Sequence, residues 1–95
     1  MNSELEPGSV PSINPLYRLQ FEKAQDAWVL LYPEGMVKLN QSAAEIMQRC
    51  DGVTSISGIA ESLGQAFDTD IPISDITGFV DVAIQQNWLK LKESV

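Results

Sequence analysis

The sequence has no histidine and a single cysteine among its 95 residues, and these absences exclude several kinds of site. A Ser–His–Asp triad, a Cys–His nucleophile pair and a Cys/His zinc site all require side chains that the chain does not contain. Cys50 has no partner for an internal disulfide, and it lies on the apolar face of a predicted helix. We therefore expect it to be a small buried apolar residue rather than a reactive thiol.

Basic side chains are also scarce, since 6 Lys and Arg stand against 13 Asp and Glu and the net charge is -7. This balance disfavours nucleic acid and anionic membranes as partners. The carboxylates are dispersed along the chain, without the spacing of a paired acid–base site or a metal site. We therefore expect no catalytic residue, no metal and no cofactor.

Long apolar runs are missing as well. No segment is long enough to span a bilayer, and residues 1–7 lack the basic-then-apolar pattern of a signal peptide, so we expect a cytoplasmic protein with no membrane partner. A chain of 95 residues suits one domain with a modest core, and both a monomer and a swapped homodimer are compatible with it. Residues 1–15 are polar and rich in proline, which predicts a flexible N-terminal tail ahead of a domain over residues 16–95.

Three strands are predicted between residues 17 and 40. Residues 17–21 alternate apolar and polar side chains, whereas residues 27–32 are apolar on both faces, as in a central strand. The segment Tyr32-Pro33-Glu34-Gly35 predicts a tight turn, because proline pre-sets φ at the second position and glycine is common at the fourth. A third strand over residues 35–40 would then end the sheet with an unpaired edge.

Three helices are predicted to follow, with serine N-caps at Ser42, Ser55 and Ser74. Glu45 completes a capping box with the first of these, and Gly52 is free to take the left-handed conformation that ends that helix. The apolar face of the second helix is expected to include Phe67. Asn87 is expected to end the third helix, because asparagine tolerates the left-handed conformation, and residues 88–91 should be extended.

These elements predict an α+β fold, a small winged helix-turn-helix-like domain with a three-stranded antiparallel sheet followed by three helices. Winged helices suggest DNA binding, but the third helix has no Lys or Arg between Ser74 and Asn87 and carries Asp75 and Asp81 instead. A winged-helix DNA-binding regulator is therefore the less favoured alternative, and an unexpected catalytic role ranks below it. A protein-interaction role is favoured, since a free strand edge can accept an extended peptide.

Helical phase separates the residues of the third helix into two sets. The centre of its apolar face, which we expect to be buried, consists of Ile76, Val80, Ala83 and Ile84. Phe79 and Val82 lie to one side, in line with Asp75 and Gln86. We therefore expect Val82 to be partly exposed.

Several motifs of the chain resemble one known family. They are Leu30-Leu31-Tyr32-Pro33-Glu34-Gly35-Met36-Val37-Lys38-Leu39-Asn40, Ala43-Ala44-Glu45-Ile46, Cys50-Asp51-Gly52, Ser74-Asp75-Ile76-Thr77-Gly78-Phe79-Val80 and Trp88-Leu89. Across residues 16–91 the chain resembles the pyrroloquinoline quinone biosynthesis protein D (PqqD) family, and the first of these motifs is the most specific.

The resemblance implies a peptide chaperone, or RiPP recognition element, that is not an enzyme. Such a protein binds the leader of the precursor peptide of pyrroloquinoline quinone and presents it to a radical-SAM enzyme that cross-links a Glu and a Tyr of that peptide. The leader adds to the third strand and packs on the third helix. The implied peptide-binding residues are Met36, Val37, Lys38, Leu39, Ile76, Phe79, Val82, Ala83 and Gln86. A recognition element for a different modified-peptide pathway is the main rival.

Overall fold

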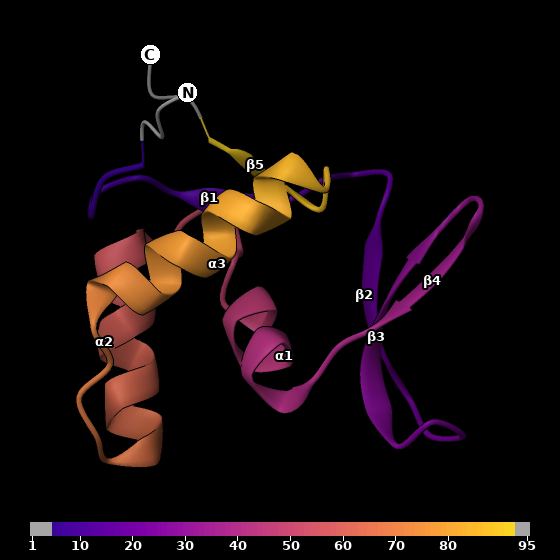
Figure 1. Cartoon of the computed structure of the whole chain (residues 1–95), viewed down its shortest axis with the longest axis horizontal. Coiled ribbons are helices and arrows are strands. Elements are labelled where there is room, and N and C mark those ends of the chain that lie inside the picture. The colour runs from indigo at the N-terminus through magenta and orange to yellow at the C-terminus, as the bar shows by residue number, and fades with distance from the viewer. Residues whose placement is uncertain (1–4, 93–95) are drawn as a thin grey trace.

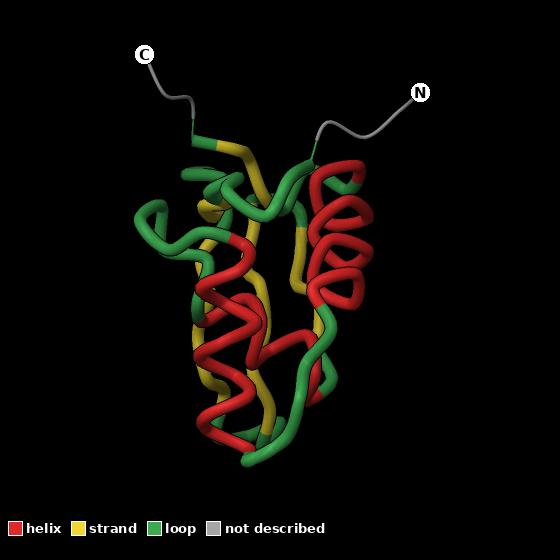
Figure 2. Tube along the Cα trace, turned by 90° about the vertical axis from the view of Figure 1, so that its left-hand side faces the viewer, coloured by secondary structure: helices red, strands yellow, loops and turns green. Residues whose placement is uncertain are grey.

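Five strands and three helices make up the computed structural model, which describes residues 5–92. In chain order they are β1 (Pro11–Ile13), β2 (Arg18–Glu22), β3 (Ala27–Tyr32), β4 (Gly35–Lys38), α1 (Gln41–Gln48), α2 (Ile56–Phe67), α3 (Ile73–Gln85) and β5 (Leu89–Leu91). Figure 1 shows the strands β2, β3 and β4 on one side of the molecule, α2 and α3 on the other, and α1 between them. In Figure 2 the helices are seen in front of the strands.

The strands β2, β3 and β4 pair antiparallel in the order β2-β3-β4, which confirms the predicted three-stranded sheet. The strand that is apolar on both faces, β3, is its centre, as predicted. Tyr32 pairs with Gly35 across the tight turn, and a Cβ atom on Gly35 would lie 3.4 Å from the Tyr32 hydroxyl. The tyrosine ring therefore lies in van der Waals range of a side chain at this position, at the end of the hairpin.

A second, two-stranded sheet joins the two ends of the chain, since β1 pairs antiparallel with β5. The extended segment at residues 88–91 is confirmed by β5, but β1 lies inside the segment that was expected to be a flexible tail. The chain ahead of β1 is also bound to the domain, because the Ile56 N–H donates to the Ser9 carbonyl at 2.8 Å. A strand of three residues that starts with proline is too short to show an alternating pattern in the sequence. Residues 1–4 of the expected tail lie outside the described residues.

The first helix starts from a different cap than the sequence predicted. Asn40 is the N-cap of α1, and its side-chain oxygen accepts a hydrogen bond from the Ala43 N–H at 2.8 Å, so the predicted capping box of Ser42 and Glu45 is wrong. Asn40 keeps the extended backbone of the preceding strand (φ -77°, ψ 175°), which is the conformation that an N-cap requires. Glu45 instead forms an ion pair with Arg49 at 2.9 Å.

The remaining helix ends agree with the sequence in part. Ser55 caps α2 as predicted, because its hydroxyl oxygen accepts from the Gly58 N–H at 3.1 Å. The cap predicted at Ser74 is wrong, since α3 begins directly after Pro72 without a side-chain cap. Pro72 is itself the N-cap, with φ -62° and ψ 138°, so α3 starts two residues earlier than a cap at Ser74 would have placed it. Asn87 has φ 68°, which confirms the predicted left-handed residue after α3.

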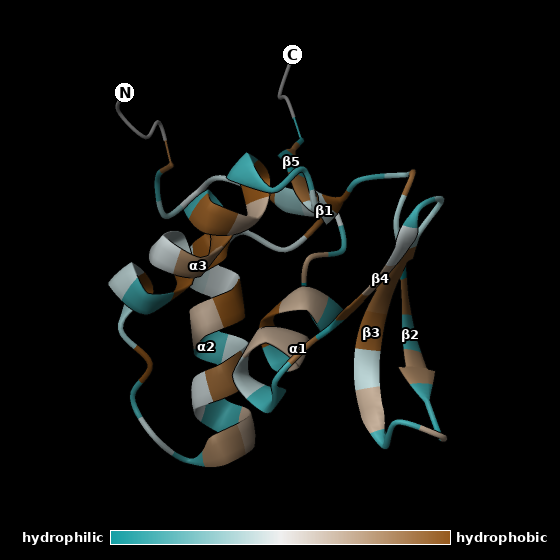
Figure 3. Ribbon diagram, turned by 45° about the vertical axis from the view of Figure 1, so that its right-hand side comes forward, coloured by the Kyte–Doolittle hydropathy of each residue, from teal (hydrophilic) through white to brown (hydrophobic). Residues whose placement is uncertain are grey.

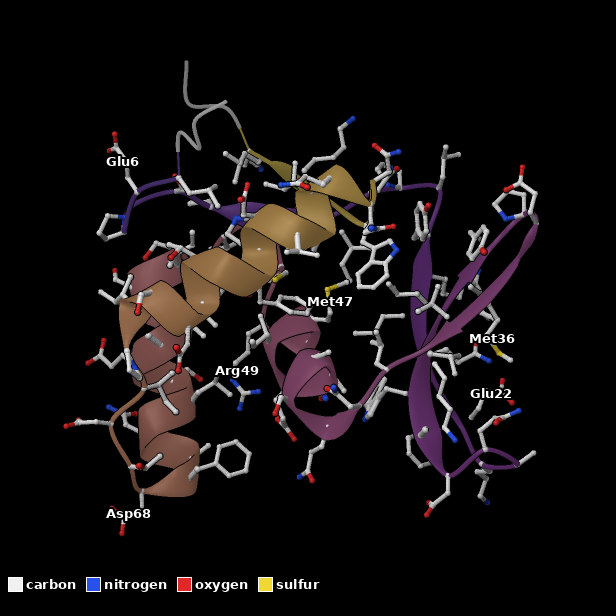
Figure 4. All side chains as sticks on the ribbon, viewed as in Figure 1. Glu6, Glu22, Met36, Met47, Arg49 and Asp68 are labelled. Carbon is white, nitrogen blue, oxygen red and sulfur yellow. The ribbon has the colours of Figure 1, made fainter. Side chains whose placement is uncertain are left out.

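The core lies between the three-stranded sheet and the helices, and Figure 3 shows hydrophobic and hydrophilic residues alternating along α2 and α3. Its fully buried residues include Leu30, Met47, Ile56, Ile59, Ile76, Val80 and Leu89. Figure 4 shows Met47 in the space between α1, α3 and the sheet. The burial predicted for Val80 is confirmed, whereas Ile84 is only half-buried. Within residues 5–92, no helix has the length and apolar character needed to cross a membrane.

Candidate peptide-binding surface

The backbone of β4 leaves hydrogen-bonding groups open along one edge of the sheet. The Leu39 N–H donates to the Trp28 carbonyl at 2.9 Å, which shows that the backbone groups of Leu39 point toward β3. The direction of the backbone N–H and C=O groups alternates from residue to residue along an antiparallel pair. The backbone groups of Val37 therefore also point toward β3, whereas those of Met36 and Lys38 point outward. Among the described residues no strand pairs with this outer edge. The edge can therefore accept an added strand.

The side chains of the four residues predicted on the third strand, of which Leu39 directly follows β4, divide between the two faces of the sheet. Leu39 is buried and Val37 is half-buried, and both contribute to the core. Met36 is 45% exposed and Lys38 is exposed on the opposite face. Figure 4 shows Met36 directed away from the helices. A peptide on this edge would therefore meet the backbone of Met36 and Lys38, whereas Leu39 serves the core.

The five residues predicted on the third helix, of which Gln86 is the C-cap of α3, divide in the same way. Ile76 and Ala83 are 1% and 0% exposed, as their phase predicted, and they are core residues. Val82 is 53% exposed, which confirms the prediction, while Phe79 is half-buried and Gln86 is exposed. These last three residues are spaced by three and four positions and so share one face of the helix. We call Phe79, Val82 and Gln86 the exposed stripe of α3.

The Cys50-Asp51-Gly52 motif shapes the loop between α1 and α2. Burial raises the pKa of the Cys50 thiol to about 12, with a further contribution from the Asp51 charge, and the thiol donates to the Ile46 carbonyl at 3.3 Å. The Asp51 carboxylate accepts from the Thr54 N–H at 2.8 Å, and this is the main hydrogen bond that lowers its pKa. Gly52 takes the left-handed conformation at φ 79°, but within this loop, after α1 has ended. The expected burial of Cys50 is confirmed, and the motif has a structural role.

A cavity of about 400 Å³ opens between α1, the carboxyl end of α2 and the amino end of α3. Its volume falls within the range of about 300–1,000 Å³ that is usual for ligand sites. The residues that line it are Gln41, Ser42, Glu45, Ile46, Leu63, Phe67, Ile71, Asp75 and Ile76. We call it the helix cavity. Ile76, although buried, is thus the one predicted peptide-binding residue that borders it.

A second cavity of about 290 Å³ lies between α1 and the hairpin of β2 and β3, and we call it the hairpin cavity. Phe21 and Trp28 line it, and their rings meet edge to face with centroids 5.7 Å apart. Gln41 and Glu45 line both cavities, so the two flank the first turns of α1.

The sequence did not predict the helix cavity. Phe67 was expected on the buried face of α2 but is 48% exposed, because it is the last residue of the helix. The acidic segment Asp68-Thr69-Asp70 directly after it was the available signal, since such a segment stays in solvent and leaves the adjacent helix end uncovered. Among residues 5–92, no cluster of three or more His, Cys, Asp or Glu is placed to hold a metal ion.

Comparison with known proteins gives matches over most of the chain. The family model described as Coenzyme PQQ synthesis protein D (PqqD) matches residues 27–89. A relative from Acinetobacter baumannii, named PqqA binding protein, is 46% identical over 94 residues, covering 96% of this chain and 99% of the relative. A PqqA binding protein from Pseudomonas aeruginosa is 46% identical over 86 residues, covering 88% of this chain and 92% of the relative.

Two solved structures share the fold. The solution NMR structure of the PqqD part of Methylobacterium extorquens PqqCD, described as a functional stand-alone RiPP recognition element, matches with a TM-score of 0.75 and 31% identity over 90% of this chain and 94% of that one. The heterocyclase TruD matches with a TM-score of 0.66 and 18% identity, over 87% of this chain and 11% of that one, and shows the fold alone. The α+β fold, the family model and the curated relatives agree, and the chain belongs to the PqqD family.

Proposed function

We propose that this chain is a peptide chaperone in the biosynthesis of pyrroloquinoline quinone, which binds the leader of the precursor peptide and catalyses no step itself. Family membership supports this proposal, as do the relatives named PqqA binding proteins. The structurally similar PqqD part of the Methylobacterium extorquens protein is described as a RiPP recognition element, which is also a binding module.

The observation that carries the proposal is the open edge of β4. Met36 and Lys38 direct their backbone groups away from β3, so an extended leader can pair with them as a fourth strand. The exposed stripe of α3 supplies apolar surface at Phe79 and Val82 and a polar side chain at Gln86. The leader would run between β4 and α3, beside α1, which lies between the sheet and the other two helices (Figure 1).

Delivery to a modifying enzyme is the second half of the proposed function. Strand addition uses one backbone edge of the peptide and leaves the residues outside the paired segment free. A radical-SAM enzyme in the cytoplasm could then cross-link the Glu and Tyr of the same peptide while the leader stays bound. A monomer of winged-helix-like fold is sufficient for this function.

Isothermal titration of the synthetic precursor peptide into the full chain tests the proposal. We expect saturable binding of one peptide per chain, and no binding of a peptide with the same composition in scrambled order. The chain with its bound peptide should also co-elute in gel filtration with the radical-SAM enzyme that modifies this peptide. Preference for the leader of another modified-peptide pathway would identify a different precursor. Salt-sensitive retardation of duplex DNA, without peptide binding, would favour the DNA-binding alternative.

A further inference from the structure

The helix cavity combines an apolar floor with an open mouth. Ile46, Leu63 and Ile76 form the floor and are 8%, 5% and 1% exposed. Phe67 stands at the rim with 48% of its surface exposed. An aromatic side chain in water beside an open apolar cavity leaves surface that an apolar ligand group would bury with a gain in affinity.

The helix cavity lies at the end of the proposed leader site, next to both the open edge of β4 and the exposed stripe of α3. Gln41 and Ser42 line its mouth, and they follow the last residue of β4, Lys38, closely along the chain. Asp75 and Ile76 line its opposite side, one turn ahead of Phe79 on the exposed stripe of α3. A chain that leaves the leader site past the carboxyl end of β4 and the amino end of α3 therefore reaches this cavity.

The direction of the bound peptide decides which of its ends arrives there. Every pair of neighbouring strands in the sheet is antiparallel, and antiparallel pairing is the slightly more stable arrangement per residue, so we expect the same for an added strand. In that orientation the amino-terminal end of the paired segment lies beside Lys38. The residues that precede this segment then continue toward α1 and the helix cavity.

We propose that the helix cavity receives a bulky apolar side chain of the precursor peptide, from the residues that precede the segment paired with β4. This inference rests on the proposed function and gives the leader a second anchor, formed by α1, α2 and α3 together. It also assigns a binding role to Phe67, which is exposed at the rim.

The charged residues at the mouth of the helix cavity restrict which residues can stand beside the inserted side chain. Glu45 is paired with Arg49 at 2.9 Å, whereas Asp75 has no ion pair among the described residues. Asp75 is exposed and lines the cavity, so its carboxylate repels an acidic neighbour of the inserted side chain and attracts a basic one. The expected ligand is an apolar side chain without a carboxylate beside it.

The hairpin cavity provides a matched control. Phe21 lines it and is 44% exposed, close to the 48% of Phe67 in the helix cavity. Phe67→Ser and Phe21→Ser therefore remove the same side chain, at similar exposure, from two cavities that share Gln41 and Glu45. A loss of affinity at one position alone identifies the cavity that the peptide enters.

The test is isothermal titration of the full-length precursor peptide, and of series shortened from either end, into the parent chain and the variants Phe67→Ser, Phe21→Ser and Val82→Asp. Thermal melting first establishes that each variant is folded. We expect Phe67→Ser to weaken binding of the full-length peptide by roughly tenfold, the size of one lost apolar contact. Phe21→Ser should bind like the parent. Removing the amino-terminal residues of the peptide should abolish the difference between Phe67→Ser and the parent.

Each alternative result has a distinct meaning. If Phe67→Ser binds the full-length peptide like the parent while Val82→Asp weakens it, the proposed function stands and the cavity anchor is rejected. Sensitivity at Phe21 instead would move the anchor to the hairpin cavity and reject the helix cavity. If shortening the carboxyl end removes the effect of Phe67→Ser, the proposed direction is wrong. A parent chain that binds no form of the peptide overturns both the function and the inference.

Discussion

Within the stretch from Leu30 to Asn40, neighbouring residues have separate roles. Leu30 and Leu39 are buried in the core, and Asn40 caps α1. Only Met36 and Lys38 turn their backbone groups to the open edge. Leu30, Leu39 and Asn40, which help to make this motif specific, therefore maintain the fold. Peptide recognition through an edge depends chiefly on the backbone, which the motif positions without needing particular side chains there.

At the residue scale, Val82→Asp and Val80→Asp should behave oppositely. Val82 is 53% exposed on the stripe of α3, so a carboxylate there should leave the melting temperature nearly unchanged. It should weaken peptide binding by about tenfold or more, because it replaces an apolar contact by a charge. Val80 is 0% exposed, and aspartate at that position should unfold the domain. Titration and circular dichroism melting measure the two effects.

Two results would contradict this pair of predictions. Parent-like affinity of Val82→Asp would show that the stripe of α3 does not contact the peptide. Parent-like melting of Val80→Asp would show that the core does not enclose this face of α3. The two variants are one half-turn apart on the same helix, so differences in helix propensity cancel in the comparison.

At the element scale, side-chain periodicity, apolar runs and turn and cap residues together located the strands β2, β3 and β4 and the three helices. Periodicity also separated the buried from the exposed face of α3, because side chains three and four positions apart share a face. The helix starts were harder to predict, since Asn40 and Ser42 are both good caps. The hydrogen bond from the Leu39 N–H to the Trp28 carbonyl keeps the chain extended up to Asn40, so Asn40 becomes the N-cap of α1. No sequence pattern shows this bond.

The prediction of the binding surface was limited in two ways. The binding set that the family resemblance implied on α3 contains both core residues, such as Ile76 and Ala83, and a surface residue, Val82, although helical phase had already separated them. The helix cavity depends on how α1, α2 and α3 meet, and each of them contributes only a few lining residues. The cavity therefore cannot be predicted before the packing is known.

The open edge of β4 gives the prediction at this scale. Lys38→Pro removes an outward N–H and should weaken peptide binding by about tenfold, since proline both loses the donor and obstructs the added strand. Lys38→Ala keeps the N–H and is the matched control, which should bind nearly as well as the parent. Both variants should remain folded, because the N–H of Lys38 is not needed for pairing with β3. Equal affinity of the two folded variants, measured by titration, would rule out strand addition at this residue.

At the scale of the whole molecule, the two ends of the described chain hold the helices in place. β1 pairs with β5, and the segment ahead of β1 supplies carbonyl groups to the first turn of α2, where Ser9 accepts from Ile56 and Pro7 accepts from Ser57. These bonds satisfy donors that a helix start leaves unpaired. The sequence reasoning assigned this segment to a tail because its polar and proline-rich composition resembles a linker, whereas its backbone groups stabilise the fold.

Truncation tests whether this N-terminal segment belongs to the folding unit. A chain that begins at residue 14 should melt roughly 10 °C below one that begins at residue 5, because it loses the β1–β5 pairing and the carbonyl partners of α2. A loss of about 1 kcal/mol in the free energy of unfolding lowers the melting temperature of a small domain by about 4–8 °C. Pro11→Asp in the longer chain should reproduce part of the loss, since Pro11 is fully buried. Peptide affinity, measured well below both melting temperatures, should be similar in the two chains, because β4 and the stripe of α3 do not include the removed residues. Equal melting temperatures would mean that residues 5–13 act as a tail after all.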